Sequence, residues 1–140
     1  MVYLDTSVAV ALFVPEPTSD AAEAWFASST DKLVSSDWLL TEFASALSIK
    51  VRHKEIAKTQ ATAVWKAFAE FTRSGLQLLP VSRNAFEQAA LLVRNVASGL
   101  RSGDSLHLAM AIEAGATAIA TTDRNLAKNA KANGLAVERF

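Results

Sequence analysis

The sequence predicts an α/β fold of three layers, α/β/α, with a central, mainly parallel sheet of about five strands. Short apolar segments alternate with helix-like segments along the whole chain, which is typical of parallel strands joined by helical crossovers. Two of these strands run through an aspartate, Asp5 or Asp123, directly into a helix. With 140 residues, 51% of them hydrophobic, the chain fits one globular domain over residues 1–140.

The first half of the chain is expected to form two strands and four helices. The last two of these helices have no strand between them, so we expect them to project as a hairpin, which Gly75 ends. The expected elements are a strand at 2–4, helices at 6–13 and 18–29, a strand at 33–35, a helix from a cap at Ser36 or Asp37 to Arg52, and a helix at 54–72.

The second half is expected to form three strands and three helices. A basic loop flanked by glycines interrupts it at residues 99–103. The expected elements are a strand at 76–81, a helix at 85–96, a helix at 105–114, a strand at 116–122, a helix at 124–133 closed by Gly134, and a strand at 135–140.

Composition excludes several classes of protein. There is no cysteine, so disulfides and thiolate metal sites are ruled out. The N-terminus has no basic segment before its apolar residues, and the longest weakly charged run, residues 106–122, is too interrupted to span a bilayer. The net charge is zero, so no global field draws the chain to a polyanion. We therefore expect a soluble, cytoplasmic protein without a membrane partner.

Four carboxylates are expected to meet at one edge of the sheet. Asp5 and Asp123 follow strands, Asp104 is expected to open a helix after Gly103, and Glu42 lies inside a helix. Glu42 faces away from the apolar stripe of its helix, which is formed by Leu40, Phe43, Leu47 and Val51. In open α/β sheets, ligands bind beyond the carboxyl ends of the strands.

Clustered carboxylates repel one another unless they are protonated or a cation neutralises them. Oxygen ligands without histidine or cysteine suit a hard ion, Mg²⁺ or Mn²⁺. Such ions position a water in line with a phosphoryl group and stabilise the charge that develops there. The alternative for each aspartate taken singly is helix capping, since Asp is among the best N-cap residues.

Four short motifs carry a resemblance to a known family. They are Val2-Tyr3-Leu4-Asp5-Thr6-Ser7, Thr41-Glu42, the segment Leu100-Arg101-Ser102-Gly103-Asp104-Ser105-Leu106-His107-Leu108-Ala109, and Thr121-Thr122-Asp123-Arg124-Asn125-Leu126. Each is short, but their order, spacing and context agree over essentially the whole chain. The sequence resembles a PIN-domain ribonuclease of the VapC toxin type.

The resemblance implies a PIN-like fold and an Mg²⁺- or Mn²⁺-dependent endoribonuclease acting as a toxin. It implies that Asp5, Glu42 and Asp104 form the core acidic triad and that Asp123 completes the site. Thr6 and Thr122 match hydroxyl positions that support such sites. It further implies an RNA substrate, inhibition by a cognate VapB-like antitoxin, and a homodimer.

Three other features have open interpretations. Arg101 is close enough to pair with an acid or to reach a scissile phosphate, or it is a solvated loop residue. His107 lies one helical turn after Asp104 on the same face; it could hydrogen-bond near the site, but it is interpreted as a packed helix histidine and not as a general base. The basic residues between positions 50 and 58 could contact RNA phosphates or simply be a solvated turn.

Two rival functions are kept. The first is a phosphotransferase or phosphatase with Asp5 as nucleophile, although Ser7 stands where the haloacid-dehalogenase pattern has a second aspartate. The second is a non-catalytic interaction module whose aspartates only cap helices. Because Asn caps nearly as well as Asp, Asp→Asn substitutions separate metal ligation from capping.

Overall fold

A central sheet of five parallel strands organises the computed structural model, which describes residues 1–138 and 140. The strand order is β3-β2-β1-β4-β5, and every neighbouring pair is parallel. The predicted sheet is confirmed. The strands are β1 (Val2–Leu4), β2 (Leu33–Ser36), β3 (Gln77–Leu79), β4 (Ala118–Ala120) and β5 (Ala136–Glu138).

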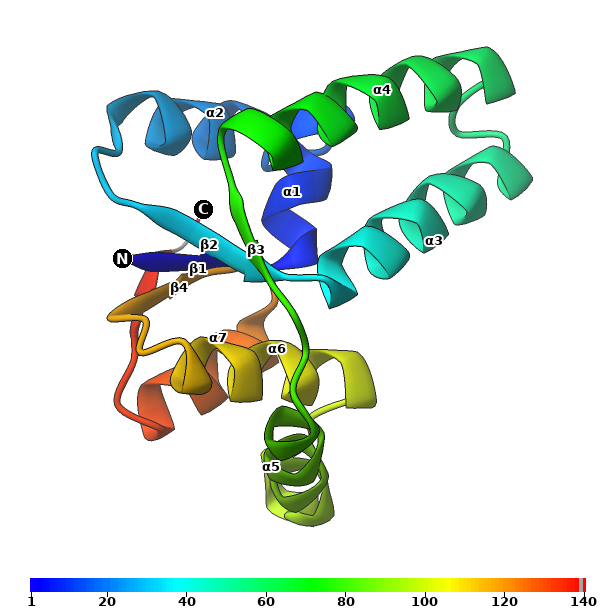
Figure 1. Cartoon of the computed structure of the whole chain (residues 1–140). Coiled ribbons are helices and arrows are strands. Elements are labelled where there is room, and N and C mark those ends of the chain that lie inside the picture. Colours follow the sequence, from blue (N-terminus) through cyan, green and yellow to red (C-terminus); the bar gives the residue numbers. More distant parts are fainter. Residues whose placement is uncertain (139) are drawn as a thin grey trace.

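Helices cover both faces of this sheet (Figure 1), which confirms the three-layer architecture. In the figure, α1 to α4 lie on one side and α5 to α7 on the other. The helices are α1 (Thr6–Phe13), α2 (Ser19–Ser28), α3 (Trp38–Arg52), α4 (Lys58–Ser74), α5 (Arg83–Arg94), α6 (Ser102–Glu113) and α7 (Arg124–Ala132), with a 3₁₀ turn, η1 (Val96–Ser98).

Alternation along the strands supplies one core to each face. Val2 and Leu4 pack with the cluster beneath α1 to α4, whereas Tyr3 packs with the cluster beneath α5 to α7. Because helices cover both faces, all three residues of β1 are buried. The order of the strands reverses between β1 and β4, and the crevice beyond their carboxyl ends is where ligands bind in such sheets.

The observed elements correct several predicted boundaries. The predicted helix at 54–72 begins only at Lys58, because Lys54 adopts a left-handed conformation (φ 59°) that turns the chain. The predicted helix at 105–114 begins three residues earlier, at Ser102. In α3 the fully buried leucine is Leu39, since positions 39, 43 and 47 share one face. Of the last predicted strand, Arg139 lies outside the described residues.

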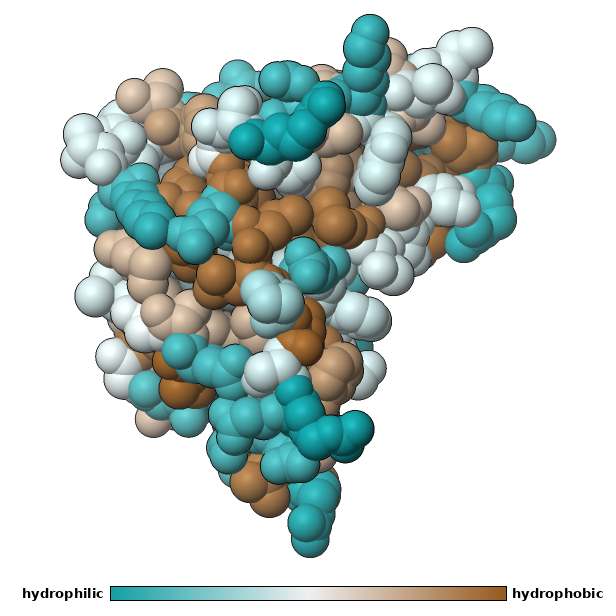
Figure 2. All heavy atoms as spheres, viewed as in Figure 1, coloured by the Kyte–Doolittle hydropathy of each residue, from teal (hydrophilic) through white to brown (hydrophobic). Residues whose placement is uncertain are grey.

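The α3–α4 pair projects from the body as a hairpin, as the sequence predicts (Figure 1). Figure 2 shows apolar side chains gathered over edge strand β3 and the adjoining α4 on the viewed face.

Within the described residues, no helix combines the length and apolar character needed to cross a bilayer.

Candidate functional site

The four predicted acids lie around one cleft at the carboxyl edge of the sheet. Asp5 follows β1, Asp123 follows β4, Glu42 lies in the second turn of α3, and Asp104 lies in the first turn of α6. All four line a cavity of about 370 Å³ together with Arg101. We call this cavity the acidic cleft, Asp5 and Glu42 its inner pair, and Asp104 and Asp123 its outer pair.

Hydroxyl groups hold Asp5 at the bottom of the cleft. Its Oδ2 accepts hydrogen bonds from Ser7 Oγ (2.6 Å) and Thr121 Oγ1 (2.9 Å), and a longer one from the Ser7 main-chain N–H (3.4 Å). No described residue donates a hydrogen bond to Oδ1, although His107 Nε2 lies 3.6 Å away. One oxygen therefore fixes the side chain, and the other remains available to a ligand.

Glu42 is fixed in a similar way from two other elements. Its Oε2 accepts from Thr6 Oγ1 (2.6 Å) at the start of α1 and from His107 Nε2 (2.8 Å) on α6. The buried Trp38 indole N–H has no hydrogen-bond partner among the described residues. Burial acts to raise the pKa of Glu42, yet His107 and Thr6 outweigh it and hold that pKa below its ordinary value.

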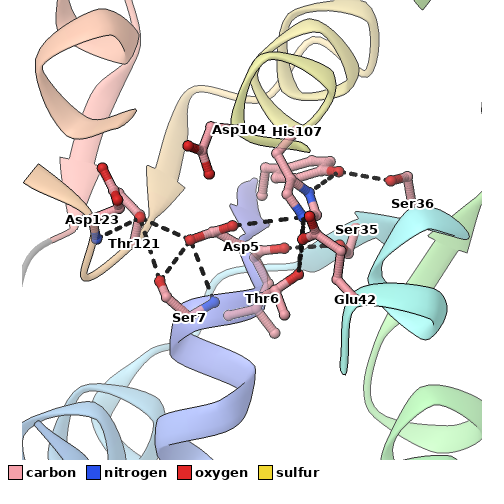
Figure 3. Close-up of polar contacts among 12 residues, drawn as sticks. Asp5, Thr6, Ser7, Ser35, Ser36, Glu42, Asp104, His107, Thr121 and Asp123 are labelled. Atoms are coloured by element: carbon pink, nitrogen blue, oxygen red, sulfur yellow. Dashed lines mark hydrogen bonds and ion pairs between the residues drawn. The ribbon is translucent and has the colours of Figure 1, made fainter. Parts of the chain in front are cut away.

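His107 has no exposed surface. Its Nδ1 lies 3.0 Å from Tyr3 Oη, which in turn lies 2.9 Å from Ser36 Oγ. Burial acts to lower the pKa of His107, but the hydrogen bond to Glu42 and the nearby carboxylates raise it above its ordinary value. The interpretation of His107 as a packed helix histidine is therefore incomplete, because the ring is packed and also bonded to a site carboxylate (Figure 3).

An exposed arginine joins the outer pair. Arg101 Nε lies 3.1 Å from Asp104 Oδ2, and its Nη2 lies 3.5 Å from Asp123 Oδ2. Burial is the main cause that raises the pKa of Asp104; Arg101 opposes it, while Asp123 and Asp5 add to it. Figure 3 shows the carboxylates of Asp104 and Asp5 on neighbouring elements around the same space.

The capping alternative accounts for only part of this arrangement. Asp123 Oδ1 does cap α7, accepting from the N–H groups of Asn125 (2.7 Å) and Leu126 (2.8 Å), while its Oδ2 faces Arg101. Asp104 is not the cap of α6, which begins at Ser102 and has Arg101 at its N-cap position, and among the described residues its side chain accepts a hydrogen bond only from Arg101. The expectation that Asp104 opens the helix was wrong, since the glycine before it is itself helical.

The supporting hydroxyls include two that the sequence predictions did not single out. Thr6 binds Glu42 as described, whereas Thr122 enters the network through its main-chain N–H, which donates to Ser7 Oγ (3.0 Å). Ser7 and the buried Thr121 are the hydroxyls that bind Asp5. Tyr3 was also missed, although a phenol within an apolar strand signals that its hydroxyl needs a partner.

The donor set fits a hard divalent cation. Among the described residues, Asp5 Oδ1, Glu42 Oε1 and Asp104 Oδ1 accept no protein hydrogen bond. One carboxylate oxygen each of Asp5 and Glu42 and one ring nitrogen of His107 lie within 4.8 Å of one another. Carboxylate oxygens around an open cleft suit Mg²⁺ or Mn²⁺, with water completing the shell.

The basic residues near the hairpin turn form a separate feature. Lys50 pairs with Glu16 and with Glu55 (3.0 Å), so part of this charge is already neutralised. The turn itself lies at the outer tip of the α3–α4 hairpin (Figure 1). Contact between these residues and a polyanion therefore remains an untested prediction.

A model of the PIN domain family matches residues 2–132. The chain belongs to the PIN domain family. This confirms the family resemblance that the motifs around Asp5 and Asp104 carry. A search among curated proteins found no significant match to this sequence.

Solved structures with the same fold include components of toxin–antitoxin systems. VapC20 of Mycobacterium tuberculosis, a toxin that cleaves the sarcin–ricin loop, has a TM-score of 0.74 at 20% identity, over 92% of this chain and 95% of its own. VapBC2 of Rickettsia felis, bound to a DNA fragment from its promoter, has a TM-score of 0.68 at 20% identity, over 100% and 99%. FitAcB of Neisseria gonorrhoeae has a TM-score of 0.69 at 17% identity, over 98% and 96%.

Proposed function

We propose that this PIN domain is an Mg²⁺- or Mn²⁺-dependent endoribonuclease that hydrolyses RNA phosphodiester bonds in the acidic cleft. The observation that carries the proposal is the convergence of four carboxylates from four elements on one open cavity. Such a cluster is electrostatically costly in the absence of a cation. Asp5, Glu42, Asp104 and Asp123 hold the ion.

A bound divalent cation supplies an activated water and neutralises charge that develops on the phosphoryl group. The protein's own residues prepare this chemistry. Ser7 and Thr121 hold the Asp5 carboxylate through one oxygen, and Thr6 does the same for Glu42. Arg101, which is 79% exposed at the rim, is placed to contact the RNA phosphate beside the scissile bond.

We further propose that the chain acts as a toxin, inhibited by a small VapB-like antitoxin whose basic side chain enters the acidic cleft. Support comes from similarly folded proteins that occur in VapBC pairs, including VapBC-5 of Mycobacterium tuberculosis.

A second copy of the chain would cover apolar side chains that remain on the surface, which fits a homodimer (Figure 2).

Expression in a bacterial host tests this function. We expect growth arrest with the wild-type chain and none with Asp5→Asn, and mapping of RNA 5′ ends should find discrete new cuts only with the wild type. Co-expression of a cognate antitoxin should restore growth. Arrest that persists in the Asp5→Asn variant without new RNA ends would contradict the proposal and favour an interaction module.

A further inference from the structure

A chain of buried polar side chains lies beneath the acidic cleft and connects three elements to Glu42. It runs from Ser36 Oγ on β2 to Tyr3 Oη on β1 (2.9 Å), then to His107 Nδ1 on α6 (3.0 Å), and from His107 Nε2 to Glu42 Oε2 on α3 (2.8 Å). Ser36, Tyr3 and His107 are all 0% exposed. The contacts can be followed in Figure 3.

Burying a hydroxyl, a phenol and an imidazole is unfavourable unless each finds a partner. In this series of polar residues each side chain is hydrogen-bonded to the next one, and the series ends at Glu42. Tyr3 occupies the middle of a strand whose other residues, Val2 and Leu4, are aliphatic. A purely apolar residue there would pack against the same core without needing these partners, so the hydroxyl points to a role at the cleft.

The two donors to Glu42 act on the same oxygen. Thr6 Oγ1 and His107 Nε2 both bind Oε2, and they also lie 2.9 Å from each other. The other oxygen, Oε1, passes close to α6, where a Cβ added to Gly103 would lie only 2.2 Å from it. Hydrogen-bond donors therefore fix one carboxylate oxygen of Glu42, Oε2. The other oxygen, Oε1, fits against α6 only because Gly103 has no side chain.

We propose that His107 is a positioning residue that orients Glu42 for cation binding, and that Tyr3 fixes the imidazole for this task. The arrangement is consistent with a proton on Nε2, which donates to Glu42, and with Nδ1 accepting from the Tyr3 hydroxyl. His107 acts through Glu42 and is not itself a ligand, because its Nε2 already has two partners and its ring has no exposed surface. This inference rests on the proposed metal-dependent function.

A double-mutant cycle read by calorimetric titration with Mn²⁺ tests this role. His107→Leu should weaken Mn²⁺ binding by about ten- to a hundredfold, the usual effect of losing a residue that supports a metal ligand. In the Glu42→Gln background the same substitution should change the affinity by less than about threefold, because the side chain it acts through has lost its charge. His107→Gln, which keeps an N–H near the Nε2 position, should restore most of the affinity.

Two further variants guard against a general effect of destabilising α6. Met110→Ala removes a buried apolar side chain (1% exposed) from the same helix and none of the hydrogen-bonding groups of the polar chain. It should lower the melting temperature and leave Mn²⁺ affinity unchanged. Tyr3→Phe keeps the ring and removes only the hydroxyl, so it tests the role even if His107→Leu does not fold; it should weaken Mn²⁺ binding several-fold, less than His107→Leu does.

Each contrary result has a different meaning. An undiminished effect of His107→Leu in the Glu42→Gln background would make His107 an independent ligand and overturn the positioning role. Equal losses of Mn²⁺ affinity in Met110→Ala and His107→Leu would mean that His107 acts only through packing. Unchanged Mn²⁺ affinity in Tyr3→Phe would mean that Tyr3 does not help to position His107. If the wild type itself neither binds Mn²⁺ nor cleaves RNA, the proposed function fails first and the inference fails with it.

Discussion

The inner and outer pairs of the acidic cleft are held by different means. Asp5 and Glu42 are fixed by hydroxyls on α1 and directly after β4, and by a fully buried histidine on α6. Asp104 and Asp123 are instead bridged by Arg101, whose side chain is 79% exposed. Donors from a rigid core fix geometry, whereas an exposed arginine mainly balances charge and can leave when a cation arrives. The inner pair therefore sets the geometry of the proposed metal site, and the outer pair adjusts its charge.

Asparagine substitutions should produce the largest difference between the two pairs. In Asp5→Asn the carbonyl oxygen can keep the bonds from Ser7 and Thr121, but an amide nitrogen then replaces the free oxygen. We expect Mn²⁺ binding by calorimetry to weaken at least about a hundredfold, more than the loss of a supporting residue costs. Asp123→Asn also keeps the cap on α7, and the loss of Mn²⁺ affinity in this variant should be about tenfold smaller than in Asp5→Asn. Equal losses would contradict the division into two pairs.

Gly103→Ala should disturb the inner pair from across the cleft. The added Cβ would stand 2.2 Å from Glu42 Oε1, so the carboxylate must move. We expect about a tenfold loss of Mn²⁺ affinity, although alanine inside a helix is by itself favourable by about 1 kcal/mol relative to glycine. Ser102→Ala, at the exposed neighbouring position, is the matched control and should leave the affinity unchanged. A loss of stability without a loss of affinity would show that Glu42 does not need this space.

In metal-free protein, removing a charge should have opposite effects in the two pairs. Despite burial, His107 and Thr6 keep the pKa of Glu42 low, so its ionised form stabilises the fold above its unfolded-state pKa and this contribution is lost as pH falls. Burial raises the pKa of Asp104, so its ionisation destabilises the fold as pH rises through the raised value.

Calorimetric scans of Glu42→Gln and Asp104→Asn check these signs. At pH 7 in a chelating buffer, Glu42→Gln should lower the melting temperature and Asp104→Asn should raise it, each by a few degrees at most. Both differences should shrink as the pH falls toward about 3, because protonation removes the charge on which each difference depends. Shifts of the same sign at pH 7 would show that the pairs are electrostatically equivalent.

Arg101→Gln should have the smallest effect on cation binding, and in the opposite direction from the other substitutions. Removing the competing guanidinium leaves the outer pair free to bind the ion, so Mn²⁺ affinity should rise about two- to fivefold. The KM for RNA should rise as well if Arg101 contacts the phosphate. Weaker Mn²⁺ binding in this variant would mean that Arg101 organises the outer pair instead of competing for it.

Much of this arrangement could be predicted from the sequence, because the signals are local. Strand and helix periodicity predicts the parallel sheet, and aspartates at strand ends predict where Asp5 and Asp123 lie. The start of α6 was misplaced because Gly103 reads as a loop residue, yet it is needed in the helix to make room for Glu42. The start of α4 was misplaced because Lys54 adopts a left-handed conformation that turns the chain between α3 and α4, and a lysine gives no sequence signal for such a turn.

The partners of the inner pair were harder to predict because they depend on side chains far apart in sequence. Ser36, Tyr3 and His107 meet only after β1, β2 and α6 have packed together. His107 within an apolar helix and Tyr3 within an apolar strand each indicate a buried polar group in need of a partner. Neither residue type reveals which partner it finds, and Thr121 could not be separated from Thr122 without the direction of each side chain.

The most direct test of the acidic cleft is RNA cleavage by the purified chain with and without a divalent cation. Total bacterial RNA would be incubated with wild-type protein and with Asp5→Asn in EDTA, in Mg²⁺ and in Mn²⁺, and the new 5′ ends mapped. The account predicts discrete cuts by the wild type only when a cation is present, and none by Asp5→Asn under any condition. Cleavage by the wild type in EDTA, or equal cleavage by Asp5→Asn, would contradict it.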